Sequence, residues 1–331
     1  MRAYIIRRLI SGVVILFILS IVVFLLLRVV AGDSADLLCG LACDEKGLEQ
    51  IREKLGLNDP YFPVSLTKDA PFVEFSGANQ YATWIKDLLT GNLGAAAINQ
   101  KPLIDTMQQR LPVTLELLII TSILTVAVGL PFGVISALYR NSLGDYAVRV
   151  TAVLGLAVPS FWVATLVIYF PSQWWGYSPP FGGAISFFED PWGNLRQFGP
   201  PSAVLALASA AGIMRLTRSS LLEVMQTDYI RTARSKGLRE VNVVSRHALK
   251  NSMIPVVTVI GLQIAGLLGG SVIIEFIFGL PGLGLLLYES LLRRDYQVVQ
   301  SMTLYIGATV IIMNLLVDIS YAWLDPRIRY S

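Results

Sequence analysis

Few residues in this sequence could do chemistry. The 331 residues include one histidine, His247, and two cysteines, Cys39 and Cys43. No G-x-x-x-x-G-K-[ST] loop is present to hold nucleotide phosphates, and neither H-E-x-x-H nor G-x-S-x-G occurs. His247 stands among basic residues, a setting more typical of a surface or capping residue than of a catalyst. The sequence therefore predicts no catalytic residue and no metal site in this chain.

Three acids lie in or near long apolar runs: Glu116, Glu275 and Asp318. Carboxylates are costly inside a membrane, so each is a candidate functional residue by default. Each also lies near the end of a predicted membrane span, where hydrogen bonding at the interface explains it equally well. No two of them have a spacing that suggests a proton relay.

Cys39 and Cys43 are four residues apart. One helical turn would place their Cα atoms about 6 Å apart, near the upper end of the disulfide range. An oxidising compartment would allow the bond. A disulfide and two unpaired small residues are both open interpretations.

The elements that would position these residues are apolar helices. Hydrophobic residues make up 54% of the chain and charged residues 15%, and several apolar runs approach the ~20 residues needed to cross a bilayer. The first run, residues 9–27, is too long for a signal peptide. We expect an all-α polytopic membrane protein with six transmembrane helices, at about residues 9–30, 113–138, 150–170 (kinked at Pro159), 202–214, 254–277 and 299–323.

Basic residues assign the sides of the membrane, because lysine and arginine resist translocation. They gather at the start of the chain, around residues 140–149, in the loop 223–253 and at the end of the chain. This pattern predicts that both termini are cytoplasmic. It divides the chain into a first span (1–31), a partly helical extracytoplasmic segment (32–111) and a five-helix core (112–331). Short helices are expected at 45–55 and 79–89.

The loop 223–253 is the most polar long segment. Helix-compatible residues run to Lys236, Gly237 interrupts them, and a second helical stretch leads to Pro255. A folded, basic element suits a protein partner, whereas the plainer interpretation is a solvated loop beside anionic lipid headgroups. In the next span, small residues should allow close helix packing: Gly261, Gly266, Gly269 and Gly270.

The run RSSLLEVMQTDYIRTARSKGL, followed by HALKNSMIPVVTVIGLQ, resembles the inner-membrane permease subunits of bacterial ABC importers. The most similar branch handles dipeptides, oligopeptides and nickel. Further matching stretches, in chain order, are IIRRL, LGLNDP, GNLG, RLPVTLEL, AVPSFW, PGLG, RRDYQVVQ and NLLVDISYAWLDPRIRY. The resemblance thus covers nearly the whole chain.

The resemblance implies that the loop holds a coupling helix, which docks on an ATPase subunit. The general family signature there is Glu-Ala-Ala, three residues, then Gly. Ala233 and Gly237 match it, whereas Arg231 and Thr232 replace the Glu and the first Ala, which puts in doubt any salt bridge assigned to that Glu. The implied ATPase-coupling residues are Asp228, Tyr229, Arg231, Thr232, Ala233, Arg234, Ser235, Lys236, Gly237 and Leu238.

The resemblance also implies an inner-membrane location and a set of partners: a second homologous permease subunit, two ABC ATPase subunits that bind ATP and Mg, an extracytoplasmic substrate-binding protein, and membrane lipid. No cofactor in this chain and no nucleic acid are expected. The separate binding protein would largely select the cargo, whether dipeptide, oligopeptide, nickel chelate or haem.

Two other classes compete with this interpretation. A stand-alone secondary transporter or channel predicts inverted repeats and polar residues at mid-span, and the sequence has neither. A membrane-embedded enzyme would need a catalytic set, which is missing.

Overall fold

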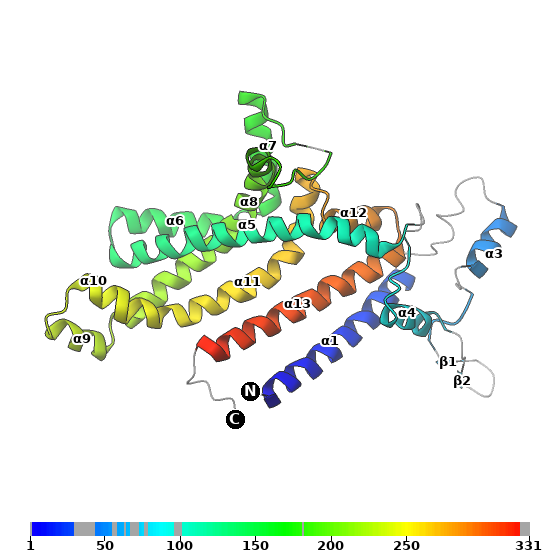
Figure 1. Ribbon diagram of the computed structural model, residues 1–331, viewed down its shortest axis with the longest axis horizontal. Coiled ribbons are helices and arrows are strands. Elements are labelled where there is room, and N and C mark those ends of the chain that lie inside the picture. Colours follow the sequence, from blue (N-terminus) through cyan, green and yellow to red (C-terminus); the bar gives the residue numbers. More distant parts are fainter. Residues whose placement is uncertain are drawn as a thin grey trace. The chain divides into compact units, whose positions relative to one another are not determined.

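The computed structural model describes residues 2–29, 44–54, 58–62, 64–66, 73–75, 79–95, 101–180 and 182–324. Cys39, Cys43 and the tail with Arg327 and Arg329 lie outside these ranges. The described part is almost entirely helical (Figure 1), with one antiparallel strand pair, β1 (Val64–Leu66) and β2 (Val73–Phe75).

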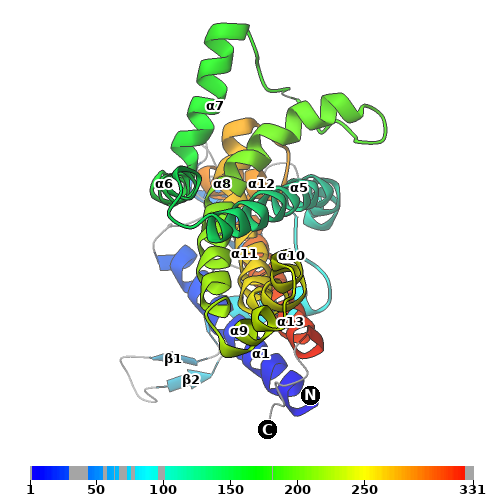
Figure 2. The ribbon, with the colours of Figure 1, turned by 90° about the vertical axis from the view of Figure 1, so that its left-hand side faces the viewer.

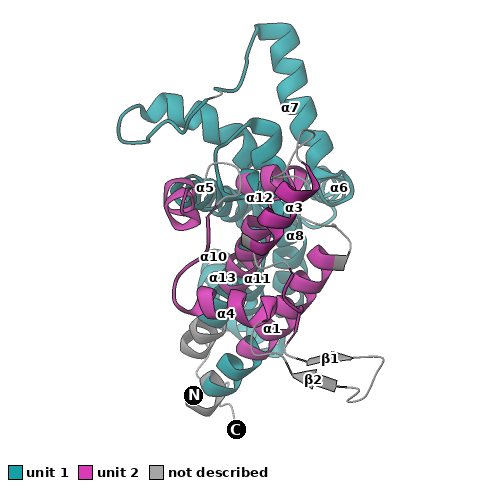
Figure 3. Ribbon diagram, turned by 90° about the vertical axis from the view of Figure 1, so that its right-hand side faces the viewer, with its two compact units in different colours: residues 1–12, 111–285, 309–331 teal, residues 13–110, 286–308 magenta. Residues whose placement is uncertain are grey.

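The helices follow one another along nearly the whole chain. Their bounds are α1 Arg2–Val29, α3 Glu45–Lys54, α4 Gln80–Leu89, α5 Leu103–Leu138, α6 Leu143–Ala157, α7 Ser160–Trp175, α8 Pro191–Val224, α9 Asp228–Ser235, α10 Glu240–Asn242, the π-helix η1 Val243–Ala248, α11 Leu249–Phe278, α12 Leu283–Leu292 and α13 Tyr296–Leu324. They form two compact units (Figure 3). Unit 1 comprises residues 1–12, 111–285 and 309–331, and unit 2 comprises 13–110 and 286–308.

Several helices are suited to cross a membrane. Among the described residues, three are long and apolar enough: Ile6–Arg28, Leu103–Leu138 and Tyr296–Val317. Two bent pairs bring the number to as many as five, namely α6 with α7, and Glu240–Ile264 with Gly266–Phe278. The prediction of a helical, polytopic membrane protein is confirmed.

The third predicted span is broken more sharply than a kinked helix. Its two halves, α6 and α7, meet at 102° (Figure 2). Pro159 has no N–H to continue the helix, and its ring disfavours helical geometry at the preceding residue. Val158 is accordingly extended, with φ −86° and ψ 126°.

The sequence predicted an apolar part at 202–214 with the helix continuing past Arg215, and α8 does continue to Val224 but begins earlier than expected, at Pro191. It begins after Asp190, whose side chain accepts a hydrogen bond from Gly193 N at 2.9 Å. A loop rich in Gly, Pro and aromatic residues was expected up to Pro200, but this part is helical from Pro191. Two of its polar residues are buried: Gln197 Nε2 donates to Gly183 O at 2.7 Å, and Asn194 Nδ2 to Ile185 O at 2.7 Å. The connection between α11 and α13 contains the helix α12.

The two short helices predicted in the segment 32–111 are present as α3 and α4. Asn79 caps α4 by accepting a hydrogen bond from Ala82 N at 2.8 Å. Within unit 2, α4 packs on α1, since Phe24 of α1 is fully buried and its ring lies 5.4 Å from that of Tyr81 and 6.0 Å from that of Trp84.

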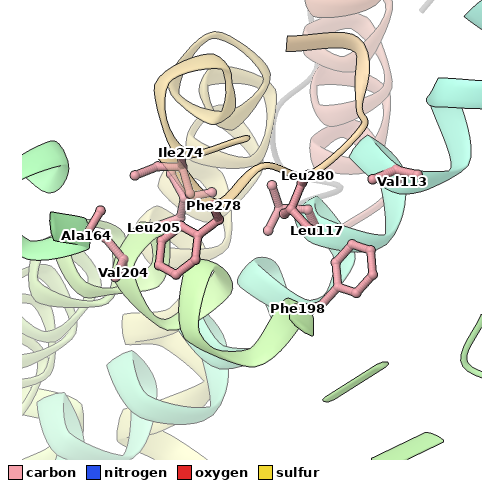
Figure 4. Close-up of a cluster of buried hydrophobic side chains, with 9 residues drawn as sticks. All are labelled: Val113, Leu117, Ala164, Phe198, Val204, Leu205, Ile274, Phe278 and Leu280. Carbon is pink, nitrogen blue, oxygen red and sulfur yellow. The ribbon is translucent and has the colours of Figure 1, made fainter. Parts of the chain in front are cut away.

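The core of unit 1 joins α5, α7, α8 and the end of α11. Figure 4 shows the buried side chains that meet there: Val113, Leu117, Ala164, Phe198, Val204, Leu205, Ile274, Phe278 and Leu280. Glycines let α5 approach α8 closely, because a Cβ at Gly129 would lie 2.8 Å from Ile213 and one at Gly133 2.6 Å from Thr217.

Candidate functional site

The short helix α9 ends where the sequence predicted a break. It runs from Asp228 to Ser235, and Gly237 has a φ of +76°. Gly237 N donates to Arg234 O at 2.9 Å, which closes the last turn. A residue with a Cβ would be strained at this positive φ, so glycine is what permits the chain to reverse direction here.

One face of α9 is anchored in unit 1. Ile230 is fully buried and Ala233 is nearly so. The side chains around them come from α5, α8 and η1, namely Ala137, Leu221, Val243 and Ala248. The short helix therefore rests on the ends of longer helices through apolar contacts (Figure 1).

The opposite face of α9 is polar and open to solvent. The side chains of Asp228 and Arg231 are 94% and 72% exposed, and their ion pair measures 3.2 Å. Tyr229 is also exposed, and its hydroxyl accepts a hydrogen bond from Asn251 Nδ2 at 2.8 Å, which ties α9 to α11. The hydroxyls of Thr232 and Ser235 donate to the carbonyls of Asp228 and Thr232 on α9 itself.

An ion pair closes the turn around Gly237. Arg234 Nη2 and Nε donate to the two carboxylate oxygens of Glu240 at 2.6 and 3.1 Å. This hydrogen bonding raises the pKa of Arg234 above its usual value. Of the ten residues predicted for coupling, those from Asp228 to Ser235 lie on α9, and Lys236, Gly237 and Leu238 form the turn after it. Nine of the ten are exposed, and Ala233 is buried.

A buried carboxylate that the sequence interpretation missed lies where α5 turns into α6. Asp145 has no exposed side-chain area and receives Nε and Nη2 of Arg218 at 2.8 and 3.0 Å. Ser136 Oγ donates to it at 2.6 Å and Asn141 N at 2.9 Å. The local pattern S-x-x-D could have marked the start of α6, since Ser142 Oγ accepts from Asp145 N.

Two of the three acids that the sequence singled out are hydrogen-bonded in the described part of the chain. Glu275 is fully buried and accepts from Thr114 Oγ1 at 2.9 Å and from Leu285 N at 3.0 Å. It thereby joins the end of α11 to α5 and to the start of α12. Glu116 accepts from Asn194 Nδ2 at 2.7 Å. The side chain of Asp318 lies outside the described part.

The four glycines predicted for helix packing divide into two kinds. A Cβ at Gly261 would lie 2.6 Å from the side chain of Val317 on α13. At Gly266, Gly269 and Gly270, a Cβ would meet nothing within 4 Å. In the described part of the chain, no group of three or more His, Cys, Asp or Glu residues could hold a metal ion.

Apolar helices bearing an anchored, charged helix and turn are the architecture of a membrane transport subunit. The fold is similar to a chain of the MetNI methionine ABC transporter in an inward-facing conformation, with a TM-score of 0.52 and 18% identity, covering 67% of this chain and 97% of that one. A second crystal form of the same transporter gives a TM-score of 0.53 and 17% identity, covering 66% of this chain and 96% of that one.

Two protein-family models match the chain and identify its class of membrane protein. Residues 129–330 match the model of the binding-protein-dependent transport system inner membrane component, and residues 1–118 match the N-terminal model of the same systems. The chain therefore belongs to this family and is a multi-pass inner-membrane permease subunit of an ABC importer.

Similar proteins match over their whole length. The chain is 39% identical over 331 residues to a putative peptide transport system permease protein of Brucella abortus. It is 37% identical over 332 residues to an oligopeptide transport system permease protein of Bacillus subtilis, and 37% over 331 residues to a glutathione transport system permease protein of Escherichia coli. Each alignment covers 100% of both chains. The resemblance to the peptide and nickel branch is confirmed.

Proposed function

We propose that this chain forms half of a translocation pathway for peptides or similar small solutes, and that the loop 223–253 couples it to ATPase subunits. The observation that carries the coupling role is the two-faced build of α9. Ile230 and Ala233 hold it on the helix bundle, while Asp228 and Arg231 face outward. A partner protein that binds the outer face of such a helix can displace it, and its buried face then transmits the displacement to the helices on which it packs.

The complete transporter contains a second homologous permease, two ATPase subunits that hold ATP and Mg, and an extracytoplasmic binding protein. The reason to expect ATP on separate subunits is the missing phosphate loop in this sequence. Peptide cargo is supported by the names of the relatives, which transport peptides, oligopeptides or glutathione.

We place six helices across the membrane, with both termini in the cytoplasm. The sixth crossing is α8, whose 34 residues exceed the ~20 that a bilayer core requires. The segments 1–31, 32–111 and 112–331 then serve as first span, extracytoplasmic segment and permease core. The open glycines Gly266, Gly269 and Gly270 suit close approach by a helix of the second permease.

The cysteine pair belongs to the extracytoplasmic segment in this topology. A disulfide between Cys39 and Cys43 would close a small loop there. Titration of free thiols in oxidised membranes tests it, and two reactive thiols would remove the idea.

The coupling role is tested with Gly237→Pro in the reconstituted transporter. Proline cannot adopt the φ of +76° at this position, so the turn and the end of α9 should be lost. We expect substrate-stimulated ATP hydrolysis and uptake both to fall about tenfold or more, the size of an ordinary coupling free energy. Arg234→Glu, which sets two carboxylates against each other at Glu240, should act in the same direction.

Gly91→Pro is the matched control. Gly91 also has a positive φ, +82°, and also donates its N–H to a carbonyl three residues earlier, but it lies in the extracytoplasmic segment. If Gly237→Pro leaves hydrolysis and uptake as they are in Gly91→Pro, the coupling assignment is wrong. Solute flux through this chain alone in liposomes would instead support a stand-alone transporter.

A further inference from the structure

The buried carboxylate of Asp145 gathers three helices at one point. Its partners come from α5 (Ser136), from the turn that follows (Asn141) and from α8 (Arg218), while Asp145 itself lies in the first turn of α6. Asp145 is buried, and its charge is balanced by Arg218 at 2.8 Å and, more distantly, by Arg149 of α6 at 3.6 Å. These helix ends are therefore held in a fixed arrangement.

The same helix ends contribute to the buried cluster on which α9 packs. Ala137, which follows Ser136 on α5, belongs to the same buried apolar cluster as Ile230 and Ala233 of α9. Leu221, three residues after Arg218 on α8, belongs to the same cluster. The buried cluster beneath α9 therefore includes residues of the two helices that Asp145 ties to α6, together with Val243 and Ala248 of η1.

The third helix at this point, α6, leads to the sharp break before α7. It ends at Ala157, and α7 begins at Ser160 at an angle of 102°. A displacement of α9 would reach this broken span through α6 if α5, α6 and α8 move together. We propose that Asp145 is a positioning residue for transport, which with Arg218 makes these helix ends one rigid body that passes the movement of α9 to α6 and α7.

This proposal rests on the proposed function of α9, and it goes beyond docking by saying where the movement travels. It assigns Asp145 no contact with the ATPase or with the cargo. Loss of its charge should leave assembly intact and should separate hydrolysis from transport.

The test is Asp145→Asn in the complete transporter, reconstituted in liposomes with its ATPase subunits, binding protein and a peptide cargo. Asparagine has nearly the same shape, but it cannot balance the buried charge of Arg218. We expect uptake per ATP hydrolysed to fall about tenfold, within the usual range of coupling between two sites, with hydrolysis in the absence of cargo within about twofold of the unchanged transporter. Asp145→Glu, which keeps the charge, should recover part of the ratio.

Glu289→Gln is the matched control, because it also removes a carboxylate from an arginine, Arg110, but at a 3.5 Å pair that is partly exposed and lies in unit 2. It should leave the ratio unchanged. If the Asp145→Asn chain does not assemble into the transporter, the same ratio is measured with Ser136→Ala, which removes one 2.6 Å hydrogen bond to Asp145 and keeps both charges. An unchanged ratio of uptake to hydrolysis in the assembled variant overturns the proposal.

Gly237→Pro, measured in parallel, separates the two ideas. If it abolishes stimulated hydrolysis while Asp145→Asn keeps the ratio, the route through Asp145 is wrong and the coupling helix stands. If Gly237→Pro has no effect, the coupling assignment itself fails, whatever Asp145→Asn does.

Discussion

Two arginine–carboxylate pairs in unit 1 have nearly the same geometry. Arg218 meets Asp145, and Arg234 meets Glu240, each through Nε and Nη2 at 2.6 to 3.1 Å. Their surroundings differ. The side chains of Arg218 and Asp145 are 19% and 0% exposed, whereas those of Arg234 and Glu240 are 41% and 57% exposed.

The difference shows that burial, rather than bond geometry, decides what an ion pair does. An exposed pair competes with water and salt, so it shapes a turn without fixing it. A buried pair adds little net stability by itself, but losing one partner leaves an uncompensated charge. The ion pair of Asp145 therefore specifies how three helix ends meet, whereas the ion pair of Glu240 shapes a surface turn without fixing it.

Asp145→Ala should give the largest effect in this comparison. It leaves the Arg218 guanidinium without its carboxylate and removes the partner of Ser136 and Asn141. We expect the free energy of unfolding to fall by about 3–5 kcal/mol, the usual cost of breaking a buried pair. Glu240→Ala should cost no more than about 1 kcal/mol. Equal costs in denaturant unfolding of the purified chain in detergent would break the distinction.

The exposed pair follows from local sequence, and the buried one does not. Arg234 and Glu240 flank Gly237 within six residues, so the break at Gly237 alone brings their side chains together. Asp145 and Arg218 are 73 residues apart. Their meeting depends on which face of α8 packs on α5 and α6, and this is decided by glycines such as Gly129 and Gly133. Backbone preference acts locally, whereas helix pairing is set by tertiary packing.

The same reasoning accounts for the misjudged extent of α8. Asn194 and Gln197 lowered the apparent hydropathy of its start, yet both are buried and hydrogen-bonded to the preceding connection. Polar residues mark a helix end only where they face water, and a sequence alone does not show which face they take. The position of the bend at Pro159, by contrast, could be predicted because proline acts on its own neighbours, although the 102° between α6 and α7 is sharper than the predicted kink.

Arg218→Lys should give an intermediate effect. Lysine keeps the charge, but its single ammonium cannot reproduce the two parallel bonds to Asp145. The loss should be about 1.5–3 kcal/mol, the worth of one hydrogen bond to a charged group. Arg234→Lys, the matched change in the exposed pair, should be close to neutral. If both substitutions shift the denaturation midpoint equally, bidentate geometry matters independently of burial.

Glu240→Gln should give the smallest effect and the one that depends on salt. The pair with Arg234 lies in solvent, where its interaction is screened over a length of about 10 Å at 0.1 M salt and about 3 Å at 1 M. We expect a loss of no more than about 1 kcal/mol at low salt, which disappears as salt is raised. Asp145→Asn should show a larger loss that salt leaves nearly unchanged, because ions do not reach a fully buried carboxylate. Unfolding measured at both salt concentrations for both variants tests this directly. A salt-sensitive Asp145→Asn would mean that water reaches the junction of α5, α6 and α8, and that junction could then not act as one rigid body.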